Sequence, residues 1–172
     1  MKYSLSSIII GLSFLLNVTS QVPTDGLIAY YPFNGNVNDE SGYGINGNVI
    51  GSTLTTDRCG NNNEAFYFDG INDKIVFDAN DRGINDRVTV CAWIKASRGD
   101  FPIIVSKYNW SEDGGYNLRL RENGDAYMEG RDGNGEFSTS NSNGISLYDK
   151  EWHFLVGQVD VDVWRIWVDG LM

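Results

Sequence analysis

Short runs of alternating apolar and polar residues follow one another along this chain, which is typical of strands that bury one face. From 116 to 121, Tyr and Leu residues alternate with Asn and Arg, and from 164 to 168 the residues Trp164, Ile166 and Val168 share one face. The pattern predicts ten strands, at 27–33, 48–53, 64–69, 74–78, 87–95, 102–107, 116–121, 126–129, 152–159 and 164–168.

The residues between these runs favour turns over helices. The chain has 20 Gly but only 3 Pro, and no long window shows helical periodicity. The pairs Asn123-Gly124 and Asn134-Gly135 are hairpin signals between neighbouring strands. A length of 172 residues suits one core. We therefore predict a single all-β domain, a sandwich or a barrel.

The first twenty residues have the pattern of a signal peptide. Lys2 provides a positive start, 8–16 form a short apolar segment, and small residues at 18–20 precede a predicted cleavage before Gln21. The apolar segment is shorter than the roughly 20 residues of a membrane span. We predict a leader at 1–20, a mature domain at 21–172 with no membrane span, and a secreted or cell-surface location; the alternative is an uncleaved N-terminal anchor.

The net charge limits the classes of binding partner, and the two cysteines raise the question of a disulfide. The net charge is −10, and loss of Lys2 with the leader would make it −11, so a nucleic-acid partner is not expected. Acidic loops do suit calcium. Cys59 lies in a turn and Cys91 in a strand; in an oxidising compartment they could form a disulfide, and the alternative is two buried thiols.

An ordered set of motifs resembles a laminin-G-like domain of the concanavalin A-like lectin/glucanase superfamily, of the kind common in secreted bacterial surface proteins. The motifs are GLIAYYPFNG (26–35), NDESGYG (38–44), TDR (56–58), FDGIND (68–73), VCAWI (90–94), IVSK (104–107), EWH (151–153) and WVDG (167–170). The resemblance implies a jelly-roll sandwich of two antiparallel sheets.

The sequence departs from this family in two ways. Family members continue past the Val-Asp-Gly turn into further strands, so we expect the domain here to be C-terminally truncated, with an unpaired edge. The connection at 160–162 is also abbreviated, which leaves the register of the last hairpin open.

The resemblance suggests a structural calcium ion near the turns that follow the aromatic runs. Its predicted ligands are Asp39, Asp69, Asn72 and Asp73, because calcium takes six to eight oxygen ligands. The alternative is that these side chains cap their own turns by accepting backbone N–H groups.

No motif for catalysis is found. The related hydrolases carry a Glu-x-Asp-x-Glu array for glycoside cleavage, and this chain has neither that array nor Gly-x-Ser-x-Gly. His153, the single histidine, lies within a predicted strand, so a structural role is expected.

Binding remains as the predicted function, in two classes. In the first, the domain binds carbohydrate through aromatic stacking and polar side chains, with Trp110, Arg119, Arg121, Tyr127 and Trp167 as candidates; each could instead belong to the core or to a solvated face. In the second, it is an adhesion or architectural module of a larger surface protein with other domains. An accessory domain of a glycan-degrading enzyme is a third alternative.

Overall fold

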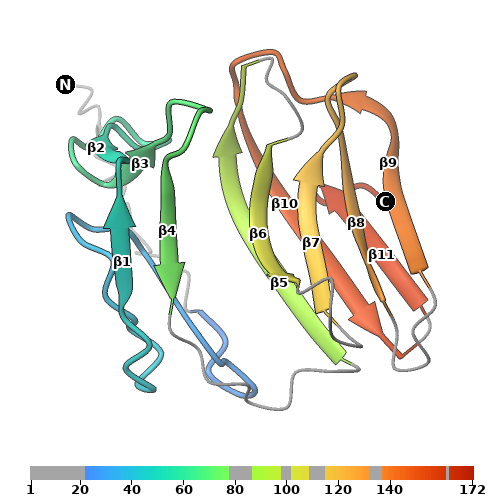
Figure 1. The fold of residues 1–172 in the computed structure, drawn as a ribbon, viewed down its shortest axis with the longest axis horizontal. Coiled ribbons are helices and arrows are strands. Elements are labelled where there is room, and N and C mark those ends of the chain that lie inside the picture. Colours follow the sequence, from blue (N-terminus) through green and yellow to red (C-terminus); the bar gives the residue numbers. More distant parts are fainter. Residues whose placement is uncertain (1–21, 78–86, 98–101, 109–114, 132–136, 162) are drawn as a thin grey trace, which may run out of the picture.

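The computed structural model describes residues 22–77, 87–97, 102–108, 115–131, 137–161 and 163–172. These residues form β-strands joined by turns and contain no helix (Figure 1). The strands are β1 (Gly47–Ile50), β2 (Thr53–Thr55), β3 (Ala65–Tyr67), β4 (Lys74–Phe77), β5 (Arg87–Lys95), β6 (Ile103–Tyr108), β7 (Gly115–Leu120), β8 (Asp125–Arg131), β9 (Phe137–Ser146), β10 (Trp152–Asp160) and β11 (Val163–Val168).

Two antiparallel sheets form the main sandwich. One has the order β6-β7-β8-β9, so its strands follow one another along the chain, and the other has the order β11-β10-β5. β10 lies in the centre of the second sheet and pairs with β5 along its whole length, from Trp152 opposite Lys95 to Asp160 opposite Arg87. The sheets pack against each other mainly through β11, which contacts β8 and β9.

Alternate residues of the facing strands build the core. Leu118 and Leu120 of β7 and Met128 of β8 are at most 1% exposed, as are Leu155 of β10 and Ile166 of β11. Burial of each such side chain contributes about 1.5–3 kcal/mol relative to exposure. The core therefore confirms the alternation predicted at 116–121 and 164–168.

Two glycines allow close packing of this core. A Cβ at Gly130 would collide with the backbone carbonyl of Gly115 and with the ring of Trp164. A Cβ at Gly157 would instead meet the thioether of Met128. Both positions need glycine for space, although only the first faces an immovable neighbour.

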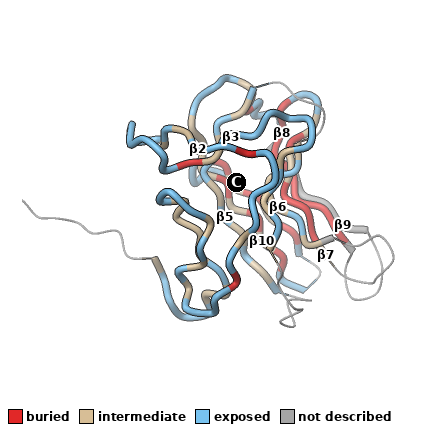
Figure 2. The backbone as a smooth tube through the Cα atoms, turned by 60° about the vertical axis from the view of Figure 1, so that its left-hand side comes forward, coloured by how far each residue is buried: buried red, intermediate tan, exposed pale blue. Residues whose placement is uncertain are grey.

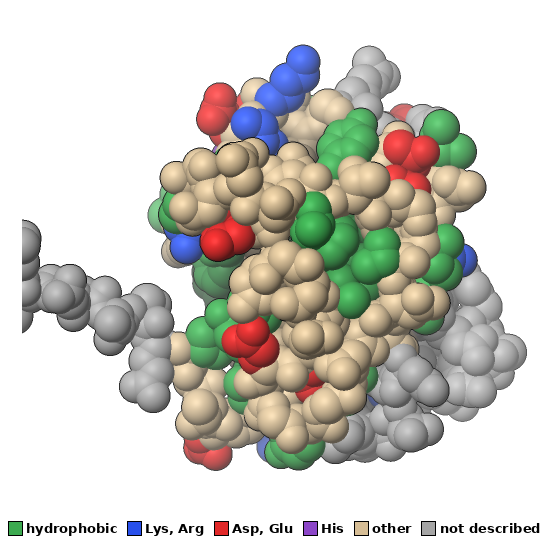
Figure 3. Space-filling view, turned by 90° about the vertical axis from the view of Figure 1, so that its left-hand side faces the viewer, with side chains coloured by type: hydrophobic (Ala, Val, Ile, Leu, Met, Phe, Trp, Pro, Cys, Tyr) green, Lys and Arg blue, Asp and Glu red, His purple; other side chains and the backbone are tan. Residues whose placement is uncertain are grey.

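Two small sheets, β1-β4 and β2-β3, lie beside the sandwich (Figure 1). Buried positions concentrate in the sandwich, and much of the N-terminal chain is exposed (Figure 2). Hydrophobic side chains gather on the face that these small sheets present (Figure 3). Large apolar residues exposed on the small sheets are Val49, Ile50, Leu54, Tyr67 and Val76.

Three strand predictions were wrong. The segment 27–33 is irregular, because its backbone is fixed by hydrogen bonds to the 39–45 loop, including Glu40 N to Tyr30 O, and not by a ladder. The predicted strand at 48–53 is divided between two sheets by Gly51, whose φ is +83°. β9 was missed, because its sequence lacks the apolar alternation that identified the other strands.

The remaining predictions agree with the strands within a few residues. The last hairpin pairs Asp160 with Val163. The predicted leader and the Asn134-Gly135 turn lie outside the described residues. The described part of the chain contains no helix that is long and apolar enough to cross a membrane. The architecture is the expected all-β, antiparallel jelly-roll sandwich.

Candidate functional site

A polar cluster covers the outer face of the four-stranded sheet, the face turned away from the core. Leu118 and Ala126 point inward, so Arg119 and Tyr127, which lie directly opposite each other in the β7–β8 register, point outward. Asn117 and Glu129 form the next outward pair. We call Asn117, Arg119, Arg121, Tyr127 and Glu129 the β7–β8 polar cluster.

Hydrogen bonds connect this cluster across three strands. Arg119 Nη1 donates to Glu129 Oε1 at 2.9 Å, and Asn117 Nδ2 donates to the same oxygen at 3.4 Å. Ser106 of β6 donates from Oγ to Asn117 Oδ1 at 2.6 Å. Glu129 is only 9% exposed, and its ion pair with Arg119 compensates its charge inside the cluster. The network fixes the positions of these side chains relative to one another.

The guanidinium groups of two arginines lie over the Tyr127 ring. The Cζ atoms of Arg121 and Arg119 lie 4.4 and 5.5 Å from its ring centroid, within cation–π range. Burial, followed by the charge of Glu129, raises the pKa of the Tyr127 hydroxyl, although both arginines oppose the shift. Because Tyr127 is 8% exposed, its ring presents little aromatic surface to solvent.

Arg121 occupies a rigid turn between β7 and β8. Its N–H donates to Asp125 O, and its carbonyl accepts from Gly124 N and from the Tyr148 hydroxyl, each at 2.9 Å. Gly124 has a φ of +89°, a conformation that glycine adopts without strain. The turn therefore fixes the backbone from which the Arg121 side chain reaches Tyr127.

The structure brings together three of the five predicted ligand-binding residues. Arg119, Arg121 and Tyr127 form one group, whereas Trp167 of β11 lies opposite Val156 on the outer face of the other sheet. Trp110 lies outside the described residues. Sequence reasoning missed Asn117 and Glu129, which the hairpin register would have paired on the outward face.

Asp39 organises the N-terminal loops. Its Oδ1 accepts the N–H groups of Tyr30 and Ser41 at 3.0 and 2.9 Å, and its Oδ2 accepts the N–H of Ile45 at 3.0 Å. Desolvation opposes ionisation, but the hydrogen bonds from Ser41, Tyr30 and Ile45 outweigh it and lower the pKa of Asp39 to about 2. This geometry accords with the turn-capping alternative.

The other predicted calcium ligands form a second turn. Asp69 N donates to Asp73 Oδ2 at 2.9 Å, and Asp69 Oδ1 accepts from Ile71 N at 2.8 Å and from Asn72 N at 3.4 Å. Among the described residues, no three His, Cys, Asp or Glu side chains are grouped as metal ligands. Calcium binding here stays a prediction.

Both cysteines are free and exposed. The Arg58 guanidinium lies 3.5 Å from Cys59 Sγ through Nη1, and its Cζ lies 4.6 Å from the Trp93 ring centroid. Trp93 and Cys91 are two residues apart in β5 and so share a face. The Cys59 turn therefore approaches the face of β5 that carries Cys91, and the bridge stays a prediction.

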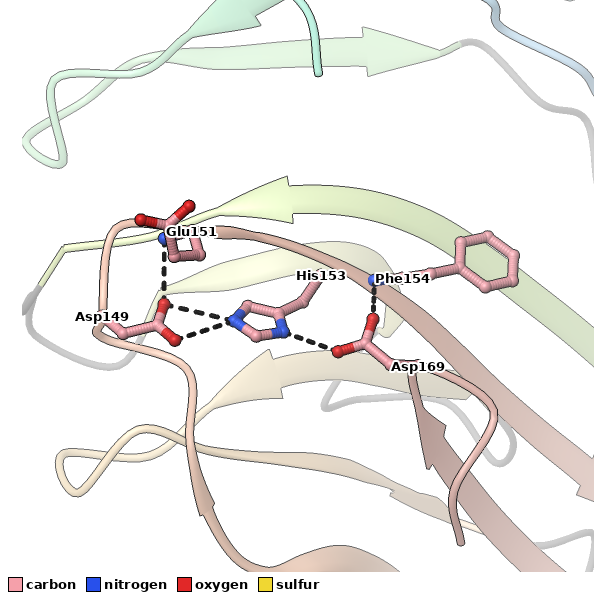
Figure 4. A network of polar contacts seen from close by, with 5 residues as sticks. All are labelled: Asp149, Glu151, His153, Phe154 and Asp169. Carbon is pink, nitrogen blue, oxygen red and sulfur yellow. Dashed lines mark hydrogen bonds and ion pairs between the residues drawn. The ribbon is translucent and has the colours of Figure 1, made fainter. Parts of the chain in front are cut away.

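His153 joins two loops, which agrees with its predicted structural role (Figure 4). Its Nδ1 lies 2.7 Å from Asp169 Oδ2, and its Nε2 lies 3.1 Å from both Asp149 oxygens. Burial lowers the pKa of His153, but the hydrogen bonds to Asp169 and Asp149 outweigh it and raise the pKa overall. We call these three residues the His153 clamp.

Solved structures share this fold. The receptor binding domain of botulinum neurotoxin mosaic serotype C/D is 20% identical, with a TM-score of 0.60. The serotype D ligand binding domain in complex with N-acetylneuraminic acid is 21% identical, with a TM-score of 0.58. Each alignment covers 78% of this chain but 34% of the toxin chain, so this chain spans about a third of their length.

Sequence comparison identifies the family. Among curated proteins, no sequence matches this chain. The Laminin_G_3 family model, described as the concanavalin A-like lectin/glucanases superfamily, matches residues 68–172, which is more than half of the chain and includes the whole sandwich from β5 to β11. The motifs, the two-sheet antiparallel sandwich and this match agree, and the chain belongs to the concanavalin A-like lectin/glucanase superfamily as a Laminin_G_3 member.

Proposed function

We propose that this chain is an exported, non-catalytic carbohydrate-binding module whose site is the β7–β8 polar cluster. The observation that carries the proposal is the network on the outer face of the four-stranded sheet, where Glu129, Asn117 and Arg119 hold one another at 2.9–3.4 Å. Polar side chains fixed in this way recognise hydroxyl groups at little entropic cost. One toxin ligand binding domain, which shares this fold over 34% of its chain, is solved in complex with N-acetylneuraminic acid, and this lends support.

A glycan panel tests this proposal. We expect measurable binding by the wild type and loss of binding by the double variant Arg119→Gln/Glu129→Gln, which removes both charges while keeping amide hydrogen bonds. Arg165→Gln, on the outer face of the other sheet, is the control. Loss of binding in Trp167→Ala but not in the double variant would move the site to that other face.

A second candidate is an adhesion or architectural module that binds protein. The hydrophobic side chains on the face of the small sheets favour it (Figure 3), because large exposed apolar patches mark interaction surfaces. The absence of binding across the whole glycan panel would favour this candidate. Hydrolysis of any panel glycan by the purified chain would contradict the non-catalytic proposal and favour an enzymatic role.

A structural calcium ion forms part of the proposal, with Asp39, Asp69, Asn72 and Asp73 as its ligands. A ligand that binds only the folded state raises the melting temperature. We expect a higher melting temperature with excess calcium than with a chelator, and a smaller rise in Asp73→Asn. Equal melting temperatures with calcium and with the chelator would mean that these side chains only cap turns.

A further inference from the structure

The two arginines on Tyr127 differ in their charge partners. Arg119 forms an ion pair with Glu129, and the side chains of this pair are 19% and 12% exposed. The Cζ of Arg121 lies closer to the ring centroid, at 4.4 Å, yet none of the ion pairs within the described residues includes Arg121. The cluster thus holds one neutralised guanidinium and one that keeps its positive charge.

The acidic groups of the same turn are engaged elsewhere or exposed. Asp125 is 9% exposed, and its Oδ2 accepts from Asn123 Nδ2 at 2.9 Å. Glu122 lies on the exposed side of the turn. Neither carboxylate forms a hydrogen bond or an ion pair with Arg121 among the contacts of the described residues, so the turn does not neutralise this guanidinium.

The Tyr127 ring also positions Arg121, whose Cζ lies over it at 4.4 Å from the ring centroid. A guanidinium whose face lies over an aromatic ring keeps its N–H groups at the edges, and that planar edge matches a carboxylate in a bidentate pair. Because the chain carries a net charge of −10, general electrostatic attraction does not draw anions to it. Selection of an anion must therefore come from this local geometry.

We propose that the β7–β8 polar cluster selects glycans that carry a carboxylate, such as sialylated or uronate-containing chains, and that Arg121 is the residue that reads the carboxylate. This inference rests on the proposed carbohydrate site. In it, Arg121 binds the carboxylate, while the Arg119, Glu129 and Asn117 network contacts neighbouring hydroxyl groups.

Paired ligands that differ only in the acidic group test this assignment. Isothermal titration compares sialyllactose with lactose, and oligogalacturonate with its methyl ester, so that the two sources of carboxylate are distinguished. We expect at least one acidic ligand to bind about 10- to 100-fold more tightly than its neutral partner, the range of one charged hydrogen-bonded contact.

Variants assign the effect to Arg121. Arg121→Gln is expected to abolish the preference for the acidic partner, and Arg121→Lys to recover only part of it, because lysine keeps the charge but not the planar fork. Arg165→Gln, a cation on the other sheet, should leave the preference intact. Circular dichroism melts confirm that each variant folds.

The outcomes separate the two proposals. Equal affinity for acidic and neutral partners, or an unchanged preference in folded Arg121→Gln, overturns the carboxylate assignment but leaves the carbohydrate site standing. Binding of none of the four ligands, together with a negative glycan panel, overturns both.

Discussion

Breaking the His153 clamp is expected to destabilise the domain in a pH-dependent way. Asp169→Asn removes the charge that faces His153 Nδ1, while the amide oxygen of the new side chain can still accept the N–H of Phe154, as Asp169 Oδ1 does at 2.8 Å. The variant thus separates the ion pair from the turn cap. Asp149 lies in the loop before β10 and Asp169 in the turn after β11, so loss of their contacts with His153 should loosen this end of the β10–β11 pair.

The expected loss of stability can be estimated from the solvent exposure of the His153 and Asp169 side chains. The His153 side chain is 16% exposed, but that of Asp169 is 45% exposed, so solvent screens the pair and its contribution is nearer that of a surface ion pair than of a buried one. We expect a loss of about 1 kcal/mol in the free energy of unfolding. For a chain of this length, about 1 kcal/mol lowers the melting temperature by roughly 2–4 °C.

The pH dependence has a defined sign. The pKa of His153 is raised above its ordinary 6.5, so its contribution is complete below 6.5 and disappears as pH rises through the folded pKa. The pKa of Asp169 is lowered from 3.8, chiefly by the hydrogen bond to His153, so its contribution is present above 3.8 and disappears in stronger acid. The clamp therefore stabilises most between 3.8 and 6.5.

Thermal melts of wild type and Asp169→Asn across this range measure the effect. The difference in melting temperature should be largest near pH 5 and shrink toward about pH 9 as His153 loses its proton. Asp160→Asn is the matched control, because the ion pair of Asp160 with Arg87 is exposed and contains no histidine. A difference that is equal at both pH values, or absent near pH 5, would refute the reasoning.

Three further predictions concern stability. Asp39→Ala leaves three backbone N–H groups without their acceptor and should cost about 2–3 kcal/mol in urea unfolding, whereas a loss below about 0.5 kcal/mol would show that water replaces the carboxylate. Gly130→Ala should destabilise by about 2–3 kcal/mol and Gly157→Ala by about 1 kcal/mol, since the first meets backbone and the second a flexible thioether; the reverse order in melts would contradict this. Air oxidation should bridge Cys59 and Cys91, lowering the intact mass by two hydrogens, and an unchanged mass with both thiols titratable would exclude the bridge.

The sequence predicted strands wherever burial imposes alternation. β5 has the predicted bounds, and the inward faces of β7 and β11 are those that the pattern indicated. The alternation of apolar and polar residues does not predict the backbone conformation of a segment that lies outside a sheet. The segment 27–33 is apolar and aromatic, yet its contacts are to the loop that Asp39 organises. β9 pairs through its backbone with β8, and its sequence carries no such signal.

The composition of the candidate site depended on a register that the sequence left open. The pair Asn123-Gly124 favours a two-residue hairpin loop, but Arg121 pairs with Asp125 around a three-residue loop in which Gly124 is left-handed. A shift of one residue would have set Arg119 opposite Met128 instead of Tyr127. Arg119, Arg121 and Tyr127 were therefore predictable as site residues, whereas Asn117, Glu129 and the contacts within the cluster were not.

The connectivity of the two main sheets determines the order in which they can form. β6 to β9 pair consecutively, whereas β5 pairs with β10 across 73 residues at Arg87 and Asp160. Closing so long a loop costs about 2 kcal/mol more entropy than closing a ~10-residue one, and non-local pairing is slow. The four-stranded sheet β6-β7-β8-β9 can thus form while β5 is still unpaired. Although β5 is the first strand of the sandwich to be synthesised, it is therefore among the last to pair.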